Sequence, residues 1–274
     1  MASATPPLVF IDTNILLDFY RARNEMQIEL LEKIDKLHES LITSYQVEME
    51  FKKNRQRAIL EALSAFKSKV SAPTPPAFLK GAKTVGAIRS REAEINDGLK
   101  RLHERTKKLM LNPTGEDPVY QSAQRLFKCK AITNLRRDRD EKKDVRRRAW
   151  KRFMLGYPPR KTNDTSIGDA INWEWVIHCS NVTSRHVIIV SRDGDYGITL
   201  DRQSYINDWL DQEFRSRTTL QRRVSLTDRL TEAMKLLDVV VTEEDERSES
   251  ELLESSASAH PTDYALHPPP VIDD

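Results

Sequence analysis

The feature that most constrains the fold is a run of four apolar residues, Leu8 to Ile11, that ends in Asp12. A short apolar run of this kind predicts a strand buried in a parallel sheet, and the ligands of open α/β sheets gather at the carboxyl ends of such strands. Asp12 therefore stands where a hydrated divalent cation could use its carboxylate. The alternative is that Asp12 only caps the helix expected to follow, and acids at matching places are needed to decide between the two.

The composition predicts a soluble, highly charged protein. With 274 residues, 38% hydrophobic and 31% charged, the chain can bury one large core. No stretch approaches the roughly 18 apolar residues of a membrane span, and residues 1–7 lack the basic and apolar regions of a signal peptide. Cys129 and Cys179 lie far apart without zinc-site spacing, which fits a reducing compartment. We therefore expect a cytoplasmic protein with no membrane association.

Charge is segregated along the chain, although the net charge is only +2. Cations crowd residues 125–161, whereas acids dominate from Thr242 onward and lead into Ser-, His- and Pro-rich sequence. Such a tail cannot bury enough apolar surface to offset its ordering entropy, so residues 241–274 are predicted to be a disordered acidic appendage. The tail also offers a docking site for a regulatory protein, or a nucleic-acid mimic that occupies a basic groove.

Short apolar runs alternate with amphipathic stretches, which predicts an α/β fold with a parallel sheet. Further strands are expected at 41–43, 187–190 and 224–226, and helices over 25–39, 43–66, 166–178, 206–215 and 228–237. Residues 85–152 are helix-forming and poor in apolar positions, with an interruption at 112–115. The prediction is one domain over 1–240, with a core of 8–70 and 156–240 and a helical insertion at about 77–155.

Four acids stand at comparable places in this pattern. Asp12 and Asp193 follow strands, while Glu50 and Asp169 lie in the first turns of helices. In a parallel sheet a helix begins at the edge where the preceding strand ends, so the four carboxylates are expected to converge. Clustered carboxylates repel one another, and a divalent cation relieves that repulsion. Oxygen ligands without His or Cys favour one or two Mg²⁺ or Mn²⁺ ions and metal-assisted hydrolysis of phosphodiesters.

Three of these acids also have a purely structural interpretation. Glu50 can pair with Lys53 on the surface of its helix. Asp169 can complete a capping box with Ser166, and Asp193 can belong to a turn.

Several segments carry a family resemblance. Residues 9–16 resemble the opening motif of PIN-domain nucleases, and 47–55 resemble the second motif of the larger bacterial PIN-like variety. Residues 156–161 with 168–173 are similar to the third motif of that variety, and 187–195 to the last strand and its acidic loop. The resemblance implies a three-layer α/β/α, PIN-like (Rossmann-like) fold with a central parallel sheet, an acidic Mg²⁺ or Mn²⁺ site, and endonuclease activity most often on RNA. It assigns the ligands to Asp12, Glu50, Asp169 and Asp193.

Two departures and two open positions qualify the resemblance. The helical insertion is absent from compact PIN toxins, which leaves the choice of substrate open. Asp195 competes with Asp193 for the metal site, and Asp164 either joins the site or caps the next helix. A phosphatase of the haloacid dehalogenase type also opens with a strand-terminal Asp, but it would have a second Asp where Asn14 stands.

Polar and cationic residues near the predicted ligands indicate how a nucleic acid would be held, because such residues contact backbone phosphates. The helix expected over 136–152 either extends this basic track or is a solvated helix with local ion pairs, and Trp150, Trp173 and Trp175 either stack on bases or pack in the core. The residues predicted to contact nucleic acid are Asn14, Lys53, Asn54, Arg55, Arg160, Lys161 and Arg192.

The leading hypothesis is a metal-dependent endonuclease acting on single-stranded RNA. By family analogy it would be the toxic effector of a bacterial toxin or phage-defence system. The alternatives are a DNA-directed nuclease and a catalytically silent PIN-like module that binds nucleic acid or protein. The tail and the helical insertion are the expected contact sites for a regulatory partner, and a homo-oligomer is compatible with the sequence.

Overall fold

The computed structural model describes residues 5–22, 25–35, 37–64, 69–159, 166–219 and 221–259. In this part of the chain five parallel strands form one sheet in the order β3-β2-β1-β4-β7. Every residue of the two central strands β1 and β4 is buried, as expected of strands covered on both faces. The strands are β1 (Leu8–Ile11), β2 (Leu41–Ser44), β3 (Asn134–Leu135), β4 (Val187–Val190) and β7 (Val224–Thr227). The α/β class with a central parallel sheet is therefore confirmed.

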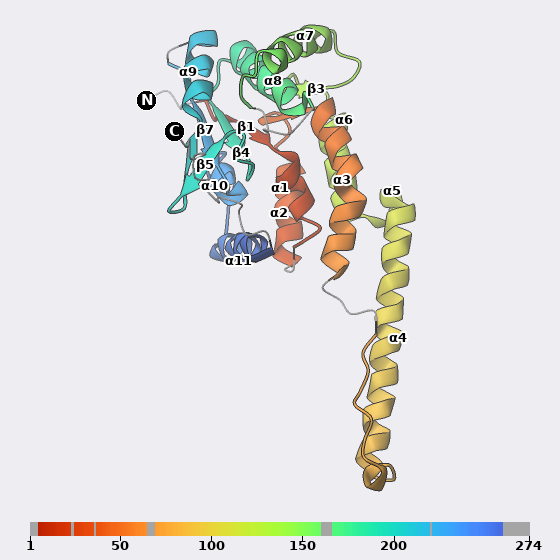
Figure 1. The fold of residues 1–274 in the computed structure, drawn as a ribbon. Helices are drawn as coiled ribbons and strands as arrows, with labels where there is room; N and C mark the ends of the chain where they lie inside the picture. The colour runs from red at the N-terminus through yellow and green to blue at the C-terminus, as the bar shows by residue number, and fades with distance from the viewer. Residues whose placement is uncertain are drawn as a thin grey trace, which may run out of the picture.

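Helices flank the sheet on both sides (Figure 1). On one side lie α7 (Glu141–Met154), α8 (Gly168–Thr183) and α9 (Asp208–Arg217), and on the other α2 (Glu25–Asp35) and α10 (Leu230–Lys235). The short α1 (Thr13–Asp18) packs against α3 (Tyr45–Ser64), which also contacts α8. The sequence predicts each of these helices. It misplaces only the start of α3. Ser44, and not Thr43, accepts the capping hydrogen bond from the Val47 amide, at 3.2 Å.

The predicted helical insertion divides into two parts of different character. From α6 (Pro118–Lys128) onward the segment belongs to the core, because Val119, Leu126 and Val145 are buried in the main hydrophobic cluster and β3 pairs with β2. Only the preceding part projects as an arm, which consists of the return stretch 69–82 with the 3-10 turn η1 (Ala77–Leu79), then α4 (Lys83–Leu111) and α5 (Pro113–Glu116) (Figure 1). The expected insertion over 77–155 is thus too long at its carboxyl end.

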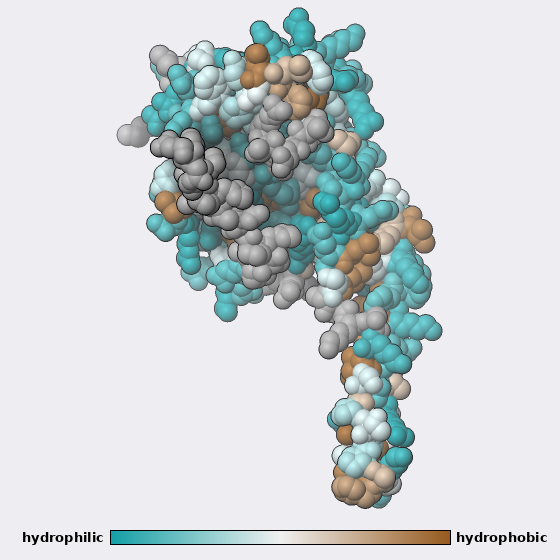
Figure 2. All heavy atoms as spheres, viewed as in Figure 1, coloured by the Kyte–Doolittle hydropathy of each residue, from teal (hydrophilic) through white to brown (hydrophobic). Residues whose placement is uncertain are grey.

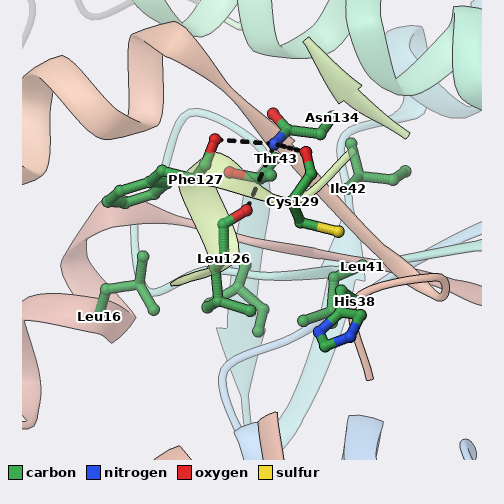
Figure 3. A pocket seen from close by; sticks show the side chains of 10 residues that line it. Leu16, His38, Leu41, Ile42, Thr43, Leu126, Phe127, Cys129 and Asn134 are labelled. Atoms are coloured by element: carbon green, nitrogen blue, oxygen red, sulfur yellow. Dashed lines mark hydrogen bonds between the residues drawn. The ribbon is translucent and has the colours of Figure 1, made fainter. Parts of the chain in front are cut away.

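Asn134 explains how β3 is held beside α6. Its amide donates to the carbonyl oxygens of Leu126, Phe127 and Cys129 at 3.3, 2.9 and 2.8 Å, which satisfies acceptors left open at the end of a helix (Figure 3). The adjoining pocket is lined mainly by apolar side chains, and none of the predicted acids contributes to it. It is a gap in the packing between α6 and the sheet.

The acidic tail was predicted to be disordered, and this is wrong for its first part. Residues 243–259 form helix α11, which packs against α2 and α10. Asp245 of α11 accepts a 3.0 Å hydrogen bond from Lys33 and is buried. Residues 260–274 lie outside the described part of the chain.

A hairpin completes the fold and was not foreseen. Strands β5 (Gly197–Leu200) and β6 (Gln203–Ile206) pair antiparallel across a two-residue turn, Asp201 and Arg202, both with positive φ. No helix in the described part of the chain has the length and apolarity needed to cross a membrane.

Candidate active site

The carboxyl ends of β1 and β4 place Asp12 beside Ser191. Ile11 pairs with Val190, so the next residue of each strand meets across the ladder, and the Ser191 hydroxyl donates to Oδ2 of Asp12 at 2.5 Å. The Thr13 amide donates to Oδ1 at 2.6 Å, and the Asn14 side chain donates to Oδ2 at 3.2 Å. The Asp12 carboxylate therefore receives a hydrogen bond from the first turn of α1 and faces the sheet edge at the same time.

Glu50 reaches the same edge from α3. Gln46, one turn earlier, donates to Oε1 of Glu50 at 2.6 Å, and the Thr13 hydroxyl donates to Oε2 at 3.0 Å. Thr13 thus links Glu50 to the residue that follows Asp12. Lys53, the proposed surface partner of Glu50, is exposed.

Asp169 is carried to this edge by the start of α8. A Cβ on Gly168 would lie 2.4 Å from Oε1 of Glu50 and 2.6 Å from Nε2 of Gln46, so the helix begins in contact with the Glu50 carboxylate. The Gly168 amide donates to the Ser166 hydroxyl at 3.2 Å, but the helix cap is Ile167 and makes no side-chain cap hydrogen bond, so the capping box of Ser166 with Asp169 stays a prediction. Glycine at 168 is the residue that leaves room for Glu50.

The buried phenol of Tyr196 lies close to all four acids. Burial raises the pKa of Tyr196 well above its ordinary value, and the carboxylates of Asp169, Asp12, Glu50 and Asp193 raise it further. Its hydroxyl is buried and makes no hydrogen bond with any described residue. The four carboxylates are therefore all within electrostatic reach of this residue. Sequence reasoning missed Tyr196, which stands in a turn-rich stretch with no motif of its own.

The burial of Asp12 and the negative charge near it raise the pKa of its carboxyl group. Burial raises the pKa of Asp12 to about 6, and the nearby Asp193 and Glu50 carboxylates add to the rise against the hydrogen bond from Ser191. No described Lys or Arg is among the groups that act on this carboxyl. A divalent cation would offset this concentration of negative charge.

The donor set fits a hydrated divalent cation. Within the described residues, no three His, Cys, Asp or Glu side chains are close enough together to hold an ion directly. Mg²⁺ keeps several of its waters and binds proteins through one or two carboxylates. Asp12, Glu50, Asp169 and Asp193 would therefore hold the ion partly through water, and the buried hydroxyl of Tyr196 lies beside them as a hydrogen-bonding group for such water.

Two predicted nucleic-acid contacts are structural instead. Arg55 is 5% exposed, and its guanidinium pairs with Asp117 at 2.7 Å and donates to the Leu109 carbonyl at 2.7 Å. Arg192 pairs with Asp18 and lies 3.5 Å from Glu249. Both predictions are wrong, because each guanidinium is enclosed by protein partners.

The other predicted contacts differ in their surroundings. Lys53 is exposed and Asn54 is partly exposed on α3, while Asn14 is bound to Asp12. Arg160, Lys161 and the alternative ligand Asp164 lie outside the described residues, and Asp195 is half-buried in the loop after Asp193. Trp173 and Trp175 are fully buried, so they pack in the core and do not stack on bases, whereas Trp150 is exposed.

A groove beside the end of β2 continues the basic track. Tyr45, Lys128, Arg136 and Arg137 line it, together with the acids Glu48 and Asp138. Arg136 and Arg137 follow β3, so they lie at the same sheet edge as the carboxylates.

One comparison with known proteins gave a match. A family model described as a PIN domain matches residues 9–196, which is more than half of the chain and includes Asp12, Glu50, Asp169 and Asp193. No curated protein and no solved structure matches the chain.

Proposed function

We propose that this chain, which belongs to the PIN-domain family, is a Mg²⁺- or Mn²⁺-dependent endonuclease that cleaves single-stranded RNA. The observation that carries the proposal is the meeting of Asp12, Glu50 and the start of α8 at one edge of the sheet, where Thr13 contacts both carboxylates and Gly168 adjoins Glu50. PIN domains are generally nucleases, and a complete set of acids weighs against a silent member of the family.

The chain's own residues have separable roles in this proposal. Asp12, Glu50, Asp169 and Asp193 would hold one or two ions, partly through water, and a bound ion would activate water and stabilise the leaving oxygen of the phosphodiester. Thr13 and Gln46 fix the Glu50 carboxylate, and Ser191 fixes Asp12. These hydrogen bonds orient the ligands before an ion arrives, which reduces the cost of assembling the site.

The substrate is held by cations at the same edge. Arg136 and Arg137 beside β2, with Lys53 and Asn54 on α3, are placed to contact backbone phosphates without reading sequence. Arg160 and Lys161 stay in the proposal on sequence grounds alone.

The test is cleavage of labelled single-stranded RNA, single-stranded DNA and duplex DNA with Mg²⁺, Mn²⁺ or EDTA. Asp12→Asn and Asp169→Asn should each abolish cleavage, while Glu116→Gln, which changes an exposed acid on α5, should not. If the protein cleaved DNA in preference to RNA, the proposed substrate would be DNA. Absence of cleavage of all three, with binding retained, would support the silent nucleic-acid module.

A bacterial toxin or phage-defence role is proposed on family analogy, with action in the cytoplasm. Induced expression in a bacterial host should arrest growth, and Asp12→Asn should relieve the arrest at equal protein level. Normal growth with active enzyme would reject the toxin role while leaving the nuclease proposal in place. A regulatory protein that binds the tail or the arm would be expected in such a system.

A further inference from the structure

One side of helix α4, the long helix of the arm, is not covered by any other described part of the chain. Helix α4 is 29 residues long, about 44 Å at 1.5 Å per residue, and none of its side chains is buried. The return stretch 69–82 runs along it, held by two hydrogen bonds between Asn96 and the backbone of Val70 at 2.8 and 2.9 Å (Figure 1). That stretch covers only one face.

An apolar seam lies next to the covered face. Ile88, Ile95, Leu102 and Leu109 follow one another at seven-residue intervals, and the first three are 48%, 49% and 50% exposed. Leu99 stands between them at the other core position of the heptad and is half-buried. Figure 2 shows apolar side chains on the projecting arm. A seven-residue apolar repeat on an exposed helix is the pattern of a coiled-coil seam, whose natural occupant is another helix with the same repeat.

The charges of α4 indicate which helix is the partner of this apolar seam. Residues 92–97 contain Glu92, Glu94 and Asp97 and no cation, whereas residues 100–105 contain Lys100, Arg101 and Arg105 against one acid, Glu104. A second α4 running antiparallel brings each acidic block opposite the basic block of its partner. A parallel pair would place acid against acid and base against base.

The apolar positions give the same register as the charges. When residues 92–97 face residues 100–105 of the other copy, Ile95 meets Leu102 and Ile88 meets Leu109. The twofold axis then passes between Gly98 and Leu99. The tip of each arm, where Phe78 is 85% exposed, comes to the root of the other, where Leu111 is 85% exposed.

From this agreement we infer that the arm is a dimerisation device, which pairs two copies of the chain through an antiparallel α4 coiled coil. The two α/β domains would lie at opposite ends of the paired arms. The inference is independent of the proposed nuclease function, since it rests on residues of the arm alone.

The mass of the full-length chain in solution tests the inference. By light scattering or sedimentation at micromolar concentration, the wild type should be a dimer and the double variant Ile95→Glu, Leu102→Glu a monomer. The matched control is Ser90→Glu with Ala93→Glu, two exposed positions on the far side of α4, which should stay dimeric. Circular dichroism should show equal helix content in all three. A monomeric wild type, or a dimer that the seam variant does not disturb, would overturn the inference.

Cross-linking tests the direction of the helices. In a Cys129→Ser background, oxidation should join two copies of Gly98→Cys, which lies at the twofold axis, and should leave Ile88→Cys unjoined because its neighbour is Leu109. Joining at residue 88 and not at residue 98 would mean a parallel pair. A dimer joined at neither site would use another surface. Either result contradicts the antiparallel arm.

Discussion

Ser191 and Asp12 are joined by a 2.5 Å hydrogen bond from the serine hydroxyl to Oδ2 of the aspartate, across the ends of β4 and β1. The same hydroxyl accepts the Asp193 amide at 3.1 Å. One small side chain therefore connects the acid after β1 to the loop that carries the acid after β4.

Removal of this hydroxyl should move the pH dependence of the enzyme. The hydrogen bond from Ser191 favours the ionised form of Asp12, so in Ser191→Ala the pKa of Asp12 rises above about 6. Less of the carboxylate is then ionised at about pH 6.5, and cleavage should fall several-fold there while recovering at about pH 8. The measurement is a pH profile of single-turnover cleavage. Ser191→Thr keeps the donor and serves as the control, and an unshifted alanine profile would contradict the assignment.

Asp12 should also make the metal-free protein less stable as the pH rises. Its folded pKa of about 6 lies above its ordinary value of 3.8, so its stabilising contribution is complete below pH 3.8 and is lost as the pH rises through 6. The full effect is about 3 kcal/mol for a shift of this size. About half of this effect is already present at pH 5, so with EDTA the stability of Asp12→Asn relative to the wild type should rise by about 1.4 kcal/mol between pH 5 and pH 8.

Urea unfolding at the two pH values measures this difference, since acid effects shared by both proteins cancel. Mg²⁺ at the higher pH should stabilise the wild type and not Asp12→Asn. A variant that is less stable than the wild type at both pH values would mean that Asp12 serves mainly as a helix cap.

The sequence predicts the ends of the two central strands well, because their places follow from the regular geometry of the fold. Strands 8–11 and 187–190 are apolar throughout, and the residue after each must lie at the sheet edge. Arg55 was misjudged because it is five residues beyond Glu50, about 140° around the helix, and so faces the opposite side. Arg192 was misjudged because it directly precedes Asp193 and points into the ion pairs behind the loop.

Other differences come from partners that are distant in sequence. The acidic α11 forms because Glu249 and Asp245 meet cations and amides of other elements, which local composition does not reveal. The turn of the β5–β6 hairpin consists of Asp201 and Arg202, both with positive φ. The usual sequence signal for such a turn is Asn-Gly or Asp-Gly, and Asp-Arg does not match it. Strand β3, at two residues, is too short to leave a pattern.

Gly168 should be needed for activity and not for folding. The methyl group of Gly168→Ala would displace the ends of Glu50 and Gln46, both flexible side chains that can turn away. Stability should change little, whereas a ligand misplaced by about 1 Å lowers cleavage by roughly 100-fold. Gly86→Ala, on open surface of α4, should keep full activity and add about 0.5–1 kcal/mol. Full activity of Gly168→Ala would remove Glu50 from the site.

Lys53 and Arg55, two residues apart on α3, should respond in opposite ways. Arg55→Ala leaves the buried carboxylate of Asp117 without its ion pair, which should cost about 3–5 kcal/mol in unfolding free energy. Lys53→Ala should leave stability within about 0.5 kcal/mol and weaken RNA binding through the loss of one phosphate contact. Chemical denaturation and salt-dependent binding separate the two. A stable Arg55→Ala that binds RNA weakly would reverse the assignment.

The carboxyl-terminal helix should support the site and not inhibit it. Glu249 accepts the amides of Leu230 and Thr231 at 2.6 and 3.0 Å, which satisfies the start of α10, and it lies 3.5 Å from Arg192. Deletion of residues 241–274 should therefore lower both the melting temperature and the rate of cleavage, because Arg192 and the adjoining Asp193 loop lose their support. Glu249→Gln should reproduce part of both effects, at about 1–3 kcal/mol, since glutamine has one acceptor oxygen where glutamate has two. Glu251→Gln, on the exposed side of α11, is the matched control and should change neither. If deletion instead raised cleavage of RNA, the tail would be an inhibitor that competes with substrate for the basic groove. The contacts of Glu249 would then hold the tail in its inhibitory position.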